Sequence, residues 1–114
     1  MKKMLNNVKL LNKYGIMLVN FVENAHFMQL GDFYRIEFHE DKQYSTKYYS
    51  LNIDITDSFT EKDYFVDVKA LDNDNFSFVL TNCTDMWEHY FENFNDMLQE
   101  LTNIDKKEYE EFNC

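Results

Sequence analysis

The chain contains no proline and only two glycines, Gly15 and Gly31, among its 114 residues. Walker-type phosphate loops and dinucleotide-binding fingerprints need several glycines at fixed spacing, so neither can be written in this sequence. No apolar run approaches the eighteen residues or so that a membrane-spanning helix requires. The first fifteen residues have Asn and Lys spread through them, which is unlike a signal peptide. These absences exclude nucleotide binding by those loops and predict no membrane segment.

Cysteine is equally scarce, because Cys83 and Cys114 are the only two and lie far apart in the sequence. They do not form a disulfide framework, and they fit a reducing cytoplasm. Abundant Asn, Lys, Tyr and Phe is typical of coding by an AT-rich genome, which indicates a low-GC bacterium or its phage. We therefore expect the protein in the cytoplasm of a bacterial host.

Motifs for catalysis or metal binding are also missing. No G-x-S-x-G turn occurs, and Cys83 has no histidine partner in the local sequence. His89 lies among carboxylates, but the H-E-x-x-H order of a zinc helix is absent. We expect no catalytic residues, no metal site and no cofactor, and a binding protein rather than an enzyme.

Basic residues are few, with 11 Lys and Arg against 21 Asp and Glu and a net charge of −10. Residues 1–53 hold seven basic and five acidic residues, whereas residues 54–114 hold four and sixteen. This surplus repels nucleic acid and membrane surfaces and steers the protein toward a basic protein surface. Ordinary solubility is the alternative explanation.

A folded domain is predicted despite this charge, because 45% of the residues are hydrophobic and 18% are aromatic. The length fits one domain over residues 1–114. Hydrophobic periodicity predicts an α+β fold: an N-terminal helix, a sheet of four to five mainly antiparallel strands, a C-terminal amphipathic helix and a short last helix. The expected elements are a helix over 2–14 ended by Gly15 and strands over 16–23, 33–39, 49–56, 64–71 and 76–81.

Two of these strand pairs have clear signals. Tyr34, Ile36 and Phe38 alternate with polar residues, and the strand over 49–56 alternates in the same way, which predicts antiparallel pairing of the two. The strands over 64–71 and 76–81 flank Asp72-Asn73-Asp74-Asn75, a typical hairpin turn because Asn and Asp tolerate left-handed backbone.

The segment 84–101 predicts the C-terminal amphipathic helix. Its apolar residues recur at helical spacing: Trp87, Tyr90, Phe91, Phe94, Leu98 and Leu101. Glu88, Glu92, Asp96 and Glu100 repeat every fourth residue between them. In a helix they would stand about 6 Å apart, close to the spacing of phosphates along a nucleic-acid strand. Asn103 would then cap the short last helix, in which Ile104, Tyr109 and Phe112 pack.

These two helices carry the predicted partner-binding site. Its members are the acids of the second half that would face water, namely Asp85, Glu88, Glu92, Asp96, Glu100, Asp105, Glu108, Glu110 and Glu111. Carboxylates held on rigid helices are preorganised for a basic groove built for a phosphate backbone. A solvated helix face without a partner is the alternative.

The chain resembles small acidic phage anti-CRISPR proteins that inhibit Cas9. The resemblance lies in its size, its charge, the order of its elements and the string Phe94-Asn95-Asp96-Met97 within a Glu-rich segment. It implies an anti-defence inhibitor that binds the nucleic-acid-binding surface of a host nuclease as a DNA mimic, without binding nucleic acid itself. The chain departs from that pattern in being longer and in having one or two more strands.

A second class of function stays open, because an immunity protein that neutralises a cognate basic toxin would need the same acidic surface. An upstream toxin gene would favour the immunity role, and a phage setting would favour the inhibitor. The sequence is compatible with a monomer or with a dimer formed through an open sheet edge.

Overall fold

The computed structural model describes residues 2–71 and 75–114, with side chains from residue 6 onward. Two helices flank five consecutive strands: α1 (Lys2–Asn24), β1 (Met28–Asp41), β2 (Thr46–Asp57), β3 (Lys62–Leu71), β4 (Phe76–Asn82), β5 (Trp87–Phe91) and α2 (Phe94–Phe112). The predicted α+β class is confirmed. Within the described ranges, neither helix combines the length and hydropathy needed to cross a bilayer.

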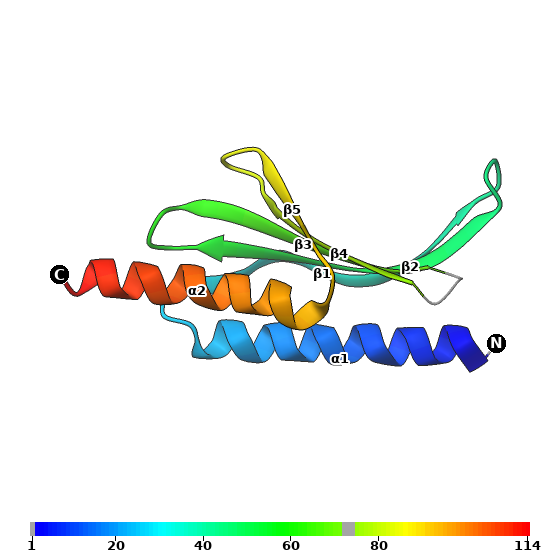
Figure 1. Cartoon of the computed structure of the whole chain (residues 1–114), viewed down its shortest axis with the longest axis horizontal. Helices are drawn as coiled ribbons and strands as arrows, with labels where there is room; N and C mark the ends of the chain where they lie inside the picture. The colour runs from blue at the N-terminus through cyan, green and yellow to red at the C-terminus, as the bar shows by residue number, and fades with distance from the viewer. Residues whose placement is uncertain (1, 72–74) are drawn as a thin grey trace.

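The strands form an antiparallel meander in the order β1-β2-β3-β4-β5. Both helices lie on one face of this sheet and run in the same direction (Figure 1). α1 packs on β1 to β3, and α2 packs on β4 and β5. Every second residue of β2, β3 and β4 is buried beneath the helices, so the sheet has a helix-covered face and an open face.

The predicted pairing of the strands over 33–39 and 49–56 is confirmed. β1 pairs antiparallel with β2, and Ile36 lies opposite the fully buried Leu51. β3 and β4 also pair, with Ala70 opposite Phe76. Residues 72–74 of the turn predicted between these two strands lie outside the described residues.

The prediction of a helix over 2–14 followed by a strand over 16–23 is wrong, because α1 continues unbroken to Asn24. Its buried residues Leu11, Leu18 and Val22 recur at i, i+7 and i+11, which is helical spacing. The branched residues of this segment suggested a strand, but burial of one helical stripe against the sheet outweighs their weak β preference.

Gly15 therefore lies inside α1 and does not end it. A Cβ at this position would overlap the hydroxyl of Tyr34, which reaches from β1 across the helix. The same Cβ would stand 3.1 Å from Tyr34 Cζ and 3.5 Å from Leu51 Cδ1. Close approach of a β1 side chain to the helix backbone is the reason for glycine here.

The single long helix predicted over 84–101 is also wrong. Residues 87–91 form β5, which pairs with β4 from Asn82 opposite Trp87 to Phe78 opposite Phe91. α2 begins only at Phe94, where the Asn93 side chain accepts a hydrogen bond from the Asp96 N–H at 2.8 Å and caps the helix. α2 then runs without a break to Phe112, so the predicted short last helix is its second half.

We expect Gly15→Ala to destabilise the protein by about 1 kcal/mol, because the new methyl group displaces Tyr34 from α1. In a Tyr34→Ala background the same substitution should instead stabilise by about 1 kcal/mol, since alanine is the better helix former. Urea denaturation of the four proteins measures both effects. An effect of the same sign in both backgrounds would contradict the packing role given to Gly15.

Candidate functional site

The sheet order separates the two halves of the sequence in space. β1 and β5 form opposite edges of the sheet, and α2 lies on the β5 side. Residues 85–111, from the β4–β5 turn to the end of α2, hold nine acidic residues and two basic ones, Lys106 and Lys107. The β5 edge is therefore the acidic side of the molecule.

The nine predicted partner-binding acids do not form one row. Asp85 lies in the β4–β5 turn, Glu88 on β5, Glu92 directly after β5, and the other six on α2. The exposed members are Asp85, Glu88, Glu92, Asp96, Glu110 and Glu111. Glu100 is half-buried, and Asp105 and Glu108 are buried. The regular helical array of Glu88, Glu92, Asp96 and Glu100 does not exist, because a strand and a loop replace its first two turns.

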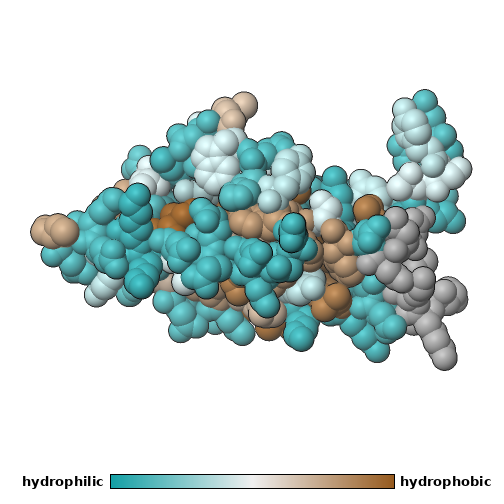
Figure 2. Space-filling model, in the orientation of Figure 1, coloured by the Kyte–Doolittle hydropathy of each residue, from teal (hydrophilic) through white to brown (hydrophobic). Residues whose placement is uncertain are grey.

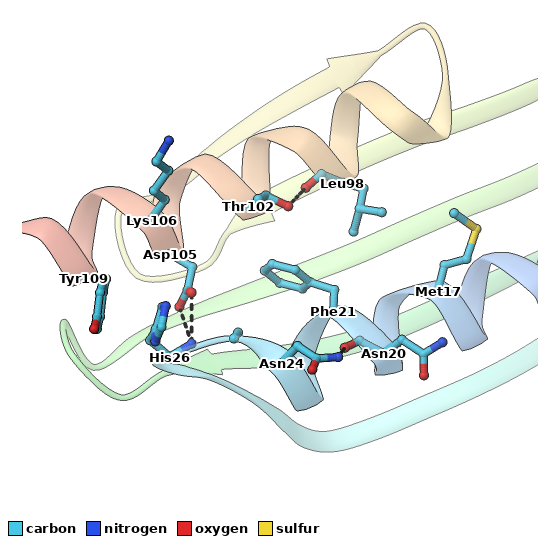
Figure 3. Close-up of a pocket in the computed structure, with 11 residues that line it drawn as sticks. Met17, Asn20, Phe21, Asn24, His26, Leu98, Thr102, Asp105, Lys106 and Tyr109 are labelled. Atoms are coloured by element: carbon cyan, nitrogen blue, oxygen red, sulfur yellow. Dashed lines mark hydrogen bonds between the residues drawn. The ribbon is translucent and has the colours of Figure 1, made fainter.

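Asp105 connects α2 to the link between α1 and β1. Its carboxylate accepts a hydrogen bond of 2.9 Å from the backbone N–H of His26, in the link between α1 and β1 (Figure 3). It accepts another of 2.9 Å from the N–H of Phe27. The His26 and Tyr109 rings stack at 3.7 Å beside these bonds. Buried bonds to a charged acceptor contribute about 1.5–3 kcal/mol each, so this side chain fastens α2 to the start of the sheet.

Glu108 forms a buried carboxyl pair with Asp57, the last residue of β2. The pKa of Glu108 is raised to about 8, first by burial and then by the hydrogen bond to Asp57 and the negative charges of Asp57, Asp105 and Glu111. In the described part of the chain, Asp57 Oδ2 and Glu108 Oε2 are buried and meet no hydrogen-bond donor. Glu108 therefore keeps its proton near neutral pH and can donate it to the Asp57 carboxylate.

The β4–β5 turn is held rigid by the buried side chain of Asn82. Its Oδ1 accepts from the N–H groups of Thr84 (3.0 Å) and Asp85 (2.8 Å), and its Nδ2 donates to Asp85 Oδ2 (3.1 Å). Lys62 of β3 lies 2.7 Å from the same Asp85 carboxylate. These contacts fix a turn that contains no glycine.

Met86, at the tip of this turn, has a left-handed backbone with φ 63° and a side chain that is 84% exposed. Left-handed conformation costs a residue with a long side chain about 1–2 kcal/mol. Such strain persists only where the surroundings impose it, and it is concentrated at functional sites. Figure 2 shows a hydrophobic tip projecting from this hairpin.

Glu88 and Tyr90 follow Met86 at alternate positions and point to the open face of the sheet. Tyr90 is 69% exposed, and its hydroxyl donates to Glu88 Oε2 at 2.9 Å, a bond that raises the pKa of Tyr90. Trp87 points to the other face and packs edge-on against Tyr64. We call the exposed set Asp85, Met86, Glu88, Tyr90 and Glu92 the hairpin surface. Met86 carried no signal in the sequence that marked it as a site.

A second surface feature is an open groove of about 580 Å³ between α1 and α2. Met17, Phe21 and Leu98 give it an apolar lining, and Asp105 and Tyr109 close one end (Figure 3). Since the Asp105 carboxylate is already bonded to the backbone, the groove offers apolar surface and little polar recognition.

The open face of the sheet carries a serine beside a histidine, with Ser50 Oγ 2.8 Å from His39 Nε2. Glu37 lies 3.7 Å from that same nitrogen, whereas a catalytic triad needs its acid on the other one. Ser50 is also only 2% exposed and contacts Asn52, so this group forms a structural polar network.

Metal and thiol chemistry find little support in the described part of the chain. It contains no group of three His, Cys, Asp or Glu side chains that could hold a metal ion. Cys83 and Cys114 are both free and exposed. Burial raises the pKa of the Cys83 thiol, as do the charges of Asp54 and Asp63, which disfavours the reactive thiolate.

The Asp57–Glu108 pair predicts a pH-dependent stability. Because the pKa of Glu108 rises from 4.5 to about 8 on folding, its stabilising contribution is full below about pH 4.5 and is lost as the pH rises through about 8. Glu108→Gln keeps a donor toward Asp57 but cannot ionise. Over that pH range, we expect the free energy of unfolding to fall more steeply in the wild type than in the variant. Parallel pH profiles in urea denaturation would contradict the raised pKa of Glu108.

Met86→Asn should raise the free energy of unfolding by about 1 kcal/mol, because asparagine tolerates left-handed backbone better than methionine. Thermal unfolding of the variant tests this directly. Met86→Ile, with a branched side chain unsuited to positive φ, is the matched control and should destabilise. Equal stability of all three proteins would show that the turn is not strained.

Comparisons of the chain with protein-family models, with curated proteins and with solved structures gave no match.

Proposed function

We propose that this protein is an acidic inhibitor that binds a basic, nucleic-acid-binding surface of a host defence nuclease through its hairpin surface. The observation that carries the proposal is a rigid turn presenting Met86 and Tyr90, both largely exposed, among the exposed acids Asp85, Glu88 and Glu92. The exposed acids of α2 lie at the same β5 edge, on the helix-covered face of the sheet.

Electrostatics supports a basic partner. Of the nine predicted partner-binding acids, Asp85 alone forms an ion pair within the described part of the chain, and its partner is Lys62. The remaining exposed carboxylates keep their charge unpaired, so the β5 side attracts cationic surfaces and speeds the encounter with them. At physiological ionic strength the attraction acts over about 8 Å, which favours a partner whose basic groups line a groove.

The hairpin surface would bind its partner differently from a regular row of carboxylates that mimic phosphates. Aromatic residues and methionine are enriched at protein interfaces, where a few buried side chains supply most of the binding energy. Here Met86 and Tyr90 would enter the basic surface as apolar anchors, and the surrounding carboxylates would pair with its Lys and Arg. Asn82 and Lys62 hold the turn in place beforehand, which lowers the ordering cost of binding.

A cleavage assay with a type II-A Cas9–guide RNA complex and linear target DNA tests this function. We expect the wild type to slow cleavage, with weaker inhibition at higher salt. Glu88→Lys/Glu92→Lys should weaken inhibition by about tenfold or more, and so should Met86→Asn/Tyr90→Thr, which keeps the backbone preferences of the turn and strand.

The control is Glu23→Lys/Glu40→Lys, which changes the net charge equally at exposed residues of α1 and of β1, the strand at the opposite edge of the sheet from the hairpin surface. It should retain most of the inhibition. Absence of inhibition by the wild type would reject Cas9 as the target. Equal inhibition by the hairpin variants and the control would reject the hairpin surface as the contact.

A further inference from the structure

The outer edge of β1 lies on the opposite side of the sheet from the hairpin surface. β1 runs for 14 residues, and in the described part of the chain it pairs with β2 alone. Its second edge therefore presents a row of backbone N–H and C=O groups that another strand can bind. Proteins usually blunt such an edge, so its side chains decide whether it invites or repels a partner.

The central part of β1 has a symmetric pattern about Ile36. On the helix-covered face, Tyr34 and Phe38 flank Ile36 and are 43% and 46% exposed. On the open face, Arg35 and Glu37 flank it and form an ion pair at 2.9 Å. Apolar residues thus stand two positions either side of the centre, and opposite charges stand one position either side.

We propose that β1 binds β1 of a second copy of this chain, antiparallel, about a two-fold axis at Ile36. In this register Tyr34 lies opposite Phe38 of the second copy, and Arg35 lies opposite its Glu37. Both pairs occur twice, because a two-fold interface uses the same surface on each subunit. The Arg35 guanidinium has five donors, so it can bond the second carboxylate in addition to its own Glu37.

The charges select this register over its neighbours. A shift by one residue would place the apolar residues of one copy on the polar face of the other. A shift by two places would set Arg35 opposite Arg35 or Glu37 opposite Glu37, and directly opposed like charges destabilise strand pairing. Among the registers within two residues of Ile36, the one centred on Ile36 pairs opposite charges and brings the exposed aromatic rings together.

A bulge limits how far the pairing can run. Leu30 lies opposite Ile55 of β2 and Tyr34 opposite Ile53, so residues 31–33 face the single residue Asp54. The Asp54 carboxylate fills the space beside Gly31, where a Cβ would stand 2.7 Å from Asp54 Cγ. A bulge bends its strand. The regular register of β1 with β2 runs from Tyr34 to Asp41, so pairing about Ile36 uses the segment 34–38, which lies within it.

The distribution of charge over the molecule also favours pairing through β1. The surplus acid of the chain belongs to residues 54–114, which hold four basic and sixteen acidic residues, and the acidic helix and hairpin lie on the β5 side. Pairing through β1 thus keeps the acidic β5 edges of two chains that each carry −10 apart. The product is a ten-stranded sheet with the two acidic edges pointing away from each other.

Sedimentation equilibrium of charge-swapped full-length chains tests the proposal. The wild type should dimerise, and Arg35→Glu or Glu37→Arg alone should raise the dimer dissociation constant by about tenfold or more, because each opposes like charges. An equimolar mixture of these two variants should recover the dimer as a heterodimer, since the two carboxylates of one variant then face the two guanidinium groups of the other. Recovery also shows that both variants are folded.

Lys107→Glu and Glu110→Arg change the net charge by the same amounts on the exposed side of α2 and should leave the dimer intact. A monomeric wild type at millimolar concentration would overturn the proposal, as would variants that dimerise like the wild type or a mixture that stays monomeric. Loss of the dimer in the α2 controls would also overturn it, by showing a general charge effect. None of these residues belongs to the hairpin surface, so the dimer and the proposed inhibition can fail independently.

Discussion

The antiparallel meander is the constraint on which the other features depend. Each strand pairs with the next one in sequence, so β1 and β5 must lie at opposite edges of the sheet. The near-neutral first half and the acidic second half of the chain are thereby placed on opposite sides of the molecule. Because the buried residues of β2, β3 and β4 alternate, both helices cover one face and leave the other open to solvent.

Short polar side chains do the work that glycine and proline do in most proteins. Asn82 organises the β4–β5 turn, Asp57 accepts from the N–H of Phe59 at 2.9 Å in the β2–β3 turn, and Asn93 caps α2. With no proline and two glycines, the chain also accepts left-handed backbone at Ser45, Glu61 and Met86. Side-chain bonds to nearby N–H groups fix such turns without special backbone freedom.

The acidic residues fall into two groups, one buried and hydrogen-bonded and one exposed to solvent. Asp57, Asp105 and Glu108 are buried: Asp57 and Asp105 accept hydrogen bonds from backbone N–H groups, and Glu108 keeps its proton near neutral pH. None of the three adds to the exposed charge. Glu88, Glu92 and the acids on the outer side of α2 stay exposed and give the β5 side its field. Net charge alone cannot separate these groups. The surface that can meet a basic partner is smaller than the count of acids suggests, and it is centred on a hairpin.

The sequence by itself determined the α+β class, the pairing of β1 with β2, the β3–β4 hairpin and the acidic second half, because clear alternation and local charge need no tertiary context. Only the tertiary structure decided the C-terminal end of α1, the β5 strand and the roles of the acids. Residues 16–23 fit a strand by composition, and burial of Leu18 and Val22 on the sheet makes them helical.

Residues 87–91 show why the sequence alone did not predict the β5 strand. Their aromatic spacing suits a helix, but the open edge of β4 offers backbone hydrogen bonds, and Asn82 turns the chain back to make them. An edge strand exposed on both faces has no burial pattern to reveal it. Asp105 and Glu108 look like solvated acids for a similar reason, because their partners His26, Phe27 and Asp57 lie about fifty to eighty residues away and come together only in the folded chain.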